Sequence, residues 1–328
     1  MTIKFNNVYV ENVSTVAGPF VIEGPLKDNF DKKFTDFYDG EKTFEKCEMK
    51  ELKESIKILL DKTKYNEEDI SFGISADLMN QLTISNFVYS NLNIPFLGVY
   101  NACASVCEEI LIAASILENE KNKKAICTTS SHNMTSERQF RNPVEYGAPK
   151  PKTTTFTVTG AASLMLTNAK TDIKVNSATI GKVIDMGVDN VFDMGAVMSP
   201  SAAYTLNEHL KQTKTKVSDY DLILTGDLGV YGKDIFKEIC EKEYNIKLDK
   251  NYDDTATMIY DYKENIYAGG SGPACMPLVV YSSIIPKMKQ RIIKKVLLIA
   301  TGALMSPTTC NQKFSIPSVS HAVCLEVI

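Results

Sequence analysis

Short apolar runs alternate along the chain with segments in which apolar side chains recur every three or four residues. The run at 94–100, Ile-Pro-Phe-Leu-Gly-Val-Tyr, is rich in residues that favour strands. This run and the segment after it predict a buried strand that turns sharply into an amphipathic helix, with Cys103 at its first turn. The apolar positions of that helix are Val106, Ile110, Ala113, Ala114, Ile116 and Leu117.

The chain also repeats itself. Residues 60–78 align without a gap with residues 210–228, and the two segments share Leu, Thr, Lys, Asp, Asp and Leu at matching places. Each segment indicates a helix end, a polar connection and a buried strand closed by Asp-Leu. A second pair, 96–130 and 264–302, follows the order strand, tight turn, helix, strand. Together they favour an internal duplication, whereas convergent patterning of strand–helix units could produce one of them alone.

Each half therefore alternates strands with helices, which predicts an α/β fold with a mostly parallel sheet covered on both faces. We place the boundary near residue 170. Residues 1–170 then form the half that carries Cys103 and a polar stretch at 130–157, and residues 171–328 form the other half. The polar stretch is too long for an ordinary connection, which indicates a functional loop.

Composition narrows the function classes. Of the 328 residues 44% are apolar, enough for a sizeable core. The formal net charge is −4 and the cations are scattered, which argues against a nucleic-acid surface. No apolar run approaches the roughly 18 residues that a spanning helix needs. The eight cysteines show no CxxC pairing, so we expect reduced thiols in a cytosolic protein, without a metal or cofactor.

Cys103 has the clearest candidate chemistry. Unpaired N–H groups and the helix dipole at a first helical turn lower the pKa of a thiol and stabilise an adjacent anion. Cys103 could therefore be a nucleophile or the floor of an anion-binding site. A small buried apolar side chain is the alternative, because most free cysteines are of that kind.

A duplicated α/β chain with a cysteine at this place resembles the thiolase and ketoacyl-synthase superfamily over its whole length. The resemblance implies two pseudo-symmetric halves stacked as a five-layered αβαβα sandwich. It aligns Cys103 with the acyl-accepting cysteine, residues 267–275 with a glycine-rich turn, and residues 321–328 with the closing strand. Homodimers are common in that superfamily, and the resemblance implies pairing through the strand at 125–130.

The catalytic partners of that superfamily do not stand at their expected places. Its enzymes activate the thiol with a His pair, a His–Asn pair, or a His and a second Cys. This chain has Asp227 at the strand end that commonly supplies His or Asn, and Gly-Ser-Gly where thiolases carry Gly-His-Pro. His209 falls on an amphipathic helix and is expected at the surface. We therefore expect the fold without enzymatic activity. The alternative is an acyl-CoA-dependent condensing enzyme in which His132 or His321 serves Cys103 as a displaced base.

Longer strings carry a narrower resemblance. Residues 129–160, Ala268-Gly-Gly-Ser-Gly, residues 300–307 and residues 316–323 resemble the stage V sporulation protein AD family. That resemblance implies a non-catalytic subunit of the spore complex that transports dipicolinic acid (pyridine-2,6-dicarboxylic acid), with calcium, in sporulation and germination. It implies a subunit that binds dipicolinic acid and contacts the other membrane subunits. Its expected place is the cytoplasmic face of the forespore or spore inner membrane, peripheral and without a spanning segment.

A site for this ligand needs N–H donors and cations on two sides of a flat ring. Such a fold would bring two helix N-termini, at Cys103 and after Gly272, to a common cleft. The polar loop adds cations, and arginine can hold a carboxylate with two N–H groups. The candidate ligand-binding residues are Cys103, His132, Asn133, Arg138, Arg141, Lys150, Asp227, Ser271, Thr301 and His321.

Plainer roles compete with ligand binding. Arg138 and Arg141 are three residues apart, as on a helical turn, and could pair with nearby glutamates. Asp77 and Asp227 stand at equivalent strand ends and could cap the turns that follow. A charged Asp227 in the cleft would repel a dicarboxylate unless calcium or a hydrogen bond offset it. A scaffold that binds no small molecule is a third function class, beside the transport subunit and the condensing enzyme.

Overall fold

The computed structural model describes residues 1–140, 150–261 and 266–328. Its strands are β1 (Thr2–Lys4), β2 (Tyr9–Ala17), β3 (Lys32–Lys33), β4 (Phe72–Ala76), β5 (Phe96–Gly98), β6 (Lys124–Ser131), β7 (Phe156–Thr157), β8 (Gly160–Thr167), β9 (Ile173–Thr179), β10 (Leu222–Thr225), β11 (Tyr252–Asp254), β12 (Gly270–Ser271), β13 (Lys295–Ala303) and β14 (Ser318–Val327). Its α-helices are α1 (Phe44–Thr63), α2 (Thr83–Tyr89), α3 (Ser105–Leu117), α4 (Asn133–Phe140), α5 (Met194–Thr213), α6 (Gly229–Tyr244), α7 (Ala256–Ile259), α8 (Cys275–Val279), α9 (Ile285–Lys289) and α10 (Pro307–Asn311).

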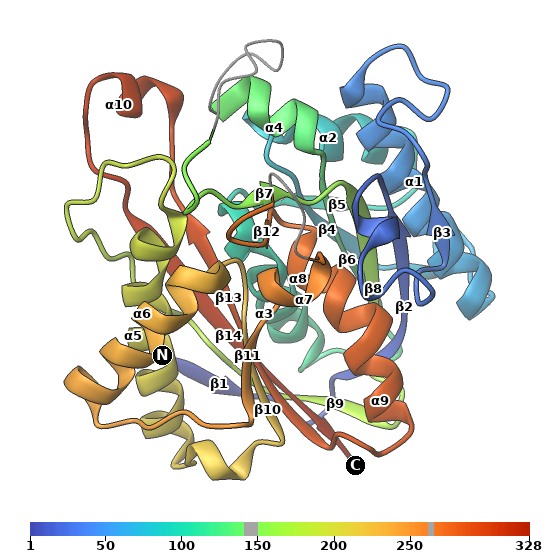
Figure 1. Cartoon of the computed structure of the whole chain (residues 1–328). Coiled ribbons are helices and arrows are strands. Elements are labelled where there is room, and N and C mark those ends of the chain that lie inside the picture. The colour runs from blue at the N-terminus through green and yellow to red at the C-terminus, as the bar shows by residue number, and fades with distance from the viewer. Residues whose placement is uncertain (141–149, 262–265) are drawn as a thin grey trace.

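One large sheet runs through the molecule (Figure 1), with the strand order β11-β10-β13-β14-β9-β2-β8-β6-β4-β5 in the described residues. The sheet is mixed, so the prediction of a mostly parallel sheet is wrong. Along this order, parallel pairs with helical crossovers occur in β4–β5–β6 and β10–β11–β13. Beside it, β3 pairs in parallel with β2 through a connection without an α-helix. The strands between these two groups pair antiparallel. β2 and β9 pair through Tyr9↔Lys174 and Val10↔Ile173 and so join two wings of the sheet. One wing is β2-β8-β6-β4-β5 and the other is β11-β10-β13-β14-β9.

Helices cover both wings and fill the space between them (Figure 1). α1 packs on β2, β6 and β8, while α5 packs on β13 and β14 with α6 beside it. α3 contacts β4 and β6 on one side and β13 and β14 on the other, which places it between the wings. Every residue of β8 is buried, as expected for a strand covered on both faces. The arrangement is a five-layered α/β sandwich.

The repeated sequence folds in the same way twice. α1 ends at Thr63 and α5 ends at Thr213, and each is followed by a lysine in the left-handed region, Lys64 with φ 62° and Lys214 with φ 60°. A short 3-10 turn and then a buried strand follow in both copies. The division of the chain near residue 170, in the turn between β8 and β9, stays a prediction.

Two expectations about exposed features are wrong. The strand at 125–130 belongs to β6, which pairs with both β4 and β8 and therefore has no free edge for a second copy. The last strand on that side of the described sheet is β5. His209 is fully buried rather than at the surface. Its Nδ1 lies 2.7 Å from the Thr179 hydroxyl and its Nε2 lies 2.9 Å from the Tyr220 hydroxyl, so both ring nitrogens have partners inside the fold.

The described part of the polar stretch at 130–157 includes regular elements. It contains the last residues of β6, the helix α4 and the short strand β7. β7 pairs with β12 in register Phe156↔Gly270 and Thr157↔Ser271. This pairing places the first-half stretch directly against the glycine-rich turn of the second half.

Candidate functional site

A cavity of about 300 Å³ opens at Cys103, where the two halves meet. Residues from α4 and β7 of the first half and from α5 and β12 of the second half form its walls. None of the described residues that line it carries a formal charge. They are Leu78, Tyr100, Ala102, Cys103, Ser136, Phe140, Thr157, Met194, Met198, Ser271, Gly272, Ala303, Leu304 and Met305.

Cys103 lies in a 3-10 turn, Ala102–Ala104, that leads into α3. The preceding residue Ala102 is in the left-handed region with φ 49°, an uncommon conformation for a residue with a side chain. The turn rests against β13 at Gly302, where an added Cβ would lie 2.5 Å from the Asn101 carbonyl oxygen. A glycine at 302 is therefore required for the approach of the two halves at this point.

Asp227 lies directly behind Cys103. Its Oδ2 accepts a hydrogen bond from the Gly272 N–H at 2.7 Å, and the thiols of Cys103 and Cys275 also hydrogen-bond to its carboxyl group. Burial raises the pKa of Asp227 to about 8, assisted by the charge of Asp254 and opposed by the hydrogen bonds. At pH 7 the carboxyl group is mostly protonated. The expected repulsion between Asp227 and a dicarboxylate therefore largely disappears.

Each of the three imidazoles is engaged by partners other than Cys103. His132 Nε2 lies 3.0 Å from the Phe37 carbonyl oxygen, and its Nδ1 accepts from the Met134 N–H. His321 Nδ1 accepts from the Gly181 N–H at 3.1 Å, and its Nε2 lies 3.1 Å from the Asn101 amide nitrogen. Burial lowers the pKa of His132, His209 and His321 to about 4, so all three are neutral at pH 7.

Arg138 and Lys150 do not line the cavity. Arg138 forms an ion pair with Glu45 and lies over the Phe44 ring, 5.7 Å from its centroid. Lys150 pairs with Glu137 at 2.7 Å. The prediction for Arg141 falls outside the described residues.

Asn133 and Thr301 are buried behind the walls. The Asn133 side chain donates to the Thr157 carbonyl oxygen, and the Thr301 hydroxyl donates to the Gly226 carbonyl oxygen. The structure thus brings together Cys103, Asp227 and Ser271 of the candidate set, with Cys103 and Ser271 in the cavity wall.

Comparison with known proteins adds the family. The model of the family "Stage V sporulation protein AD (SpoVAD)" matches residues 1–326. The chain belongs to the stage V sporulation protein AD family. It is 40% identical over 319 residues to stage V sporulation protein AD of Bacillus subtilis (strain 168), which covers 97% of this chain and 94% of that one. Membership makes this chain a sporulation protein.

The family fold is thiolase-like. The chain is similar to a single-substitution variant of OleA from Xanthomonas campestris, with a TM-score of 0.62, 14% identity and 99% of both chains covered. It is also similar to 3-oxoacyl-[acyl-carrier-protein] synthase III of Aquifex aeolicus VF5, with a TM-score of 0.59, 13% identity, and 97% and 99% of the two chains covered. Identities this low support the shared fold and the predicted sandwich, and nothing about shared chemistry.

Several wall residues of this family member were missed in the sequence. Ser136 and Phe140 lie four apart on α4, and Met194 and Met198 lie four apart at the start of α5, so each pair shares one helix face. That spacing was the available signal. It could not be distinguished from ordinary core packing, because nothing in the sequence says that the two faces meet the same cavity.

Two features are absent from the described residues. No helix among them is long and apolar enough to cross a membrane. No cluster of three or more His, Cys, Asp or Glu side chains among them could hold a metal ion.

Proposed function

We propose that this chain is a non-catalytic subunit that binds dipicolinic acid for the complex that transports it across the spore membrane in sporulation and germination. The carrying observation is the environment of Cys103. A thiol at the position of an acyl-accepting cysteine faces a buried carboxyl group, Asp227, in an uncharged cavity of about 300 Å³. Family membership supplies the sporulation context.

The absence of a suitable base among the described residues supports a binding role over acyl transfer. A general base must reach the thiol in its unprotonated form. The three imidazoles are neutral, but each has both ring nitrogens hydrogen-bonded or closely approached by other groups. Asp227 does reach Cys103, but burial raises its pKa to about 8, so only its minor ionised form at pH 7 could accept the thiol proton. Cys103 is therefore proposed as part of the cavity wall.

The cavity suits a small flat acid. Tyr100, Phe140 and the two methionines supply apolar surface for a ring. Ser136, Thr157 and Ser271 line the same cavity, and their hydroxyl groups are of a kind that can donate to carboxylate oxygens. The Ser136 hydroxyl is buried and has no hydrogen-bond partner among the described residues, so it is available to a ligand. Polar donors among apolar walls are the usual composition of a small-molecule site.

The remaining parts of the proposal concern place and partners. We expect the chain at the cytoplasmic face of the forespore or spore inner membrane, attached to the other subunits of the complex without spanning the bilayer. A second copy could pair through the outer edge of β5, where Leu97 is 46% exposed.

Calorimetric titration tests the ligand. Dipicolinate should bind saturably, and benzene-1,3-dicarboxylate, which lacks the ring nitrogen, serves as the matched control ligand. Parallel titrations with and without calcium establish whether calcium accompanies the acid. Cys103→Ala and Ser136→Ala should each weaken binding. Cys310→Ala, a half-buried cysteine on α10 outside the cavity wall, should leave it unchanged.

Mass spectrometry after exposure to acetyl-CoA tests the chemistry. An unmodified Cys103 together with dipicolinate binding supports the proposal. A thioester on Cys103 would refute it in favour of a condensing enzyme. If the protein neither binds dipicolinate nor accepts an acyl group, a scaffold role remains.

A further inference from the structure

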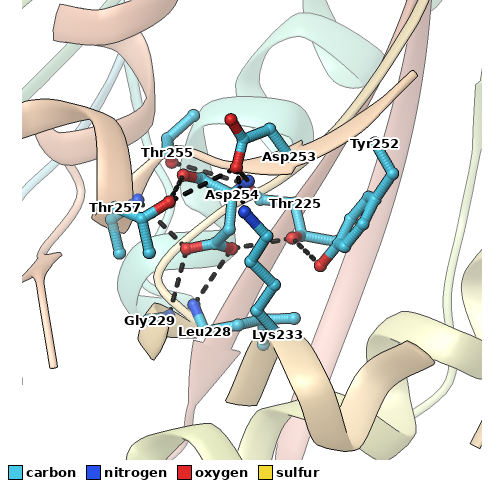
Figure 2. Close-up of polar contacts among 10 residues, drawn as sticks. Thr225, Leu228, Gly229, Lys233, Tyr252, Asp253, Asp254, Thr255 and Thr257 are labelled. Atoms are coloured by element: carbon cyan, nitrogen blue, oxygen red, sulfur yellow. Dashed lines mark hydrogen bonds and ion pairs between the residues drawn. The ribbon is translucent and has the colours of Figure 1, made fainter. Parts of the chain in front are cut away.

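The turn at residues 226–229 connects β10 to α6 and carries Asp227 at its second position. A single carboxylate on the neighbouring strand holds this turn (Figure 2). Asp254 Oδ2 accepts from the Thr225 hydroxyl at 2.7 Å and from the Leu228 N–H at 3.2 Å. Its Oδ1 accepts from the Gly229 N–H at 3.0 Å and from the Ala256 N–H at 3.1 Å. Both oxygens are thus fully used in fixing backbone and side chain around the turn.

The parallel register explains why this aspartate is at the right place. Thr225 pairs with Asp254 as the last residues of β10 and β11. The chain leaves β10 through the turn immediately after this pair. A carboxylate at position 254 therefore lies within hydrogen-bonding distance of the Leu228 and Gly229 N–H groups in the turn.

The equivalent turn of the first half is built differently. Asp77 stands at the matching strand end and caps its own turn, accepting from the Met79 N–H at 2.9 Å and from the Ser85 N–H at 2.8 Å. In the second half, Asp254 performs the capping, and Asp227 accepts from the Gly272 N–H instead. In the first half one aspartate, Asp77, both stands at the strand end and caps the turn. In the second half these two roles are divided between Asp227 and Asp254.

The conformation that presents Asp227 needs support. Asp227 has φ 68°, in the left-handed region that residues with side chains seldom adopt. Gly229 also has φ 68°, and an added Cβ there would lie 2.3 Å from the Ala268 carbonyl oxygen. Such backbone persists only where the surroundings fix it. The four hydrogen bonds to Asp254 are polar contacts that do so.

We propose that Asp254 is a positioning residue for the cavity, acting through Asp227. By fixing the turn at 226–229 it holds the Asp227 carboxyl against Gly272 and Cys103, which form part of the cavity wall. This inference rests on the proposed function for its ligand readout. The reactivity of the Cys103 thiol supplies a second readout that does not depend on the ligand.

Asp254→Asn is the test, because asparagine keeps the shape and places an amide NH₂ where one oxygen accepted two hydrogen bonds. Asp253→Asn is the matched control. Asp253 lies next to Asp254 on β11, and its side chain pairs with Lys233 and contacts Thr257 instead of the turn (Figure 2). Its Oδ1 accepts from the Asp254 N–H at 2.9 Å, a hydrogen bond that an asparagine oxygen can also accept. Asp254→Asn should weaken dipicolinate binding at least tenfold and change the rate at which iodoacetamide alkylates Cys103 at least threefold. Asp253→Asn should change neither.

A double-mutant cycle distinguishes positioning from general stability. If Asp254 acts through Asp227, then Asp254→Asn should have little further effect on either readout in an Asp227→Asn background. Equal effects in both backgrounds would overturn the proposal, as would unchanged Cys103 alkylation in folded Asp254→Asn protein. Should Asp254→Asn fail to fold, Thr225→Val replaces it, because this change removes one of the four hydrogen-bond donors to Asp254. The same two readouts, dipicolinate binding and Cys103 alkylation, then decide. Absence of dipicolinate binding in the wild type would refute the proposed function alone, since Cys103 alkylation still decides the role of Asp254.

Discussion

The buried side chain of Glu48 should make the free energy of unfolding depend on pH. It lies on α1, is 1% exposed, accepts a hydrogen bond from the Ser130 hydroxyl at 3.0 Å, and has its other carboxyl oxygen 2.9 Å from the Thr135 hydroxyl oxygen. Burial, together with the charge of Asp77, raises its pKa from 4.5 to about 8. The group must therefore stay protonated in the folded protein at a pH at which the unfolded chain would ionise it.

The sign and size of the effect follow from this pKa shift. An acid whose pKa is raised by folding gives full stability below the unfolded pKa and loses it as pH rises through the folded pKa. For Glu48 this window runs from about pH 4.5 to about pH 8. Each pH unit within it lowers the free energy of unfolding by about 1.4 kcal/mol. At pH 7 the accumulated loss is about 3 kcal/mol.

Glu48→Gln removes the titration while keeping the shape. The glutamine oxygen can still accept from the Ser130 hydroxyl, and its NH₂ can donate to the Thr135 hydroxyl. That hydroxyl can accept because it already donates to the His132 carbonyl oxygen. The variant should have nearly wild-type stability at pH 4.5 and exceed it by about 3 kcal/mol at pH 7.

Urea unfolding at half-unit steps from pH 4.5 to 8.5 measures this difference. Glu54→Gln is the control on the same helix, because Glu54 is a partly exposed partner of Lys32 and should contribute under about 1 kcal/mol with no such pH trend. A constant difference between Glu48→Gln and wild type across the range would show that Glu48 does not carry the buried proton.

Other outcomes follow from particular contacts. Burial lowers the pKa of His209 to about 4, so its contribution is present above pH 6.5 and lost as pH falls through 4; His209→Asn should reduce the acid loss of stability by up to about 3 kcal/mol in urea unfolding. Gly272→Ala should cost about 2 kcal/mol or more in thermal unfolding, because the glycine has φ 108° and an added Cβ would lie 2.7 Å from the Ser131 hydroxyl oxygen. Gly187→Ala, also left-handed but with no atom within 4 Å of the added Cβ, should cost only about 1 kcal/mol. Leu298→Ala in the buried centre of β13 should cost about 2–5 kcal/mol, measured by the same urea titration.

The local pattern of apolar and polar residues predicted several of the helices and strands. The strand–turn–helix around Cys103 appears as β5, a 3-10 turn and α3, but β5 is an edge strand with Leu97 and Gly98 exposed, so the prediction of a buried strand there is wrong. The repeated segments at 60–78 and 210–228 end in matching buried strands. These features depend on residues close together in the chain. The order of strands in the sheet depends on pairings between distant segments, such as β2 with β9, and apolar periodicity does not specify them. That is why a mixed sheet was predicted as mostly parallel.

The partners of polar side chains were harder to predict for the same reason. Arg138 pairs with Glu45, a residue 93 positions away, so the sequence showed a free cation where the fold has an ion pair. His209 reads as a surface residue on an amphipathic helix until Thr179 and Tyr220 are seen at its two ring nitrogens. A candidate site chosen by residue type therefore includes groups whose hydrogen bonds are already satisfied elsewhere. Cys103, Asp227 and Ser271 come together because the turn before α3, the end of β10 and the glycine-rich turn at β12 meet at one place.

The duplication also explains how binding could replace proton transfer with few changes. Two pseudo-equivalent strand ends carry Asp77 and Asp227, and of these two Asp227 approaches the helix start at Cys103. A carboxyl group there, with its pKa raised to about 8 by burial, could take the thiol proton at pH 7 only in its minor ionised form. It leaves the described lining of the cavity without a formal charge, so a dicarboxylate there would meet little fixed negative charge. In the proposed binding function, the decisive difference therefore lies at one strand end, at Asp227, and is supported by the Asp254 cap on the adjacent strand.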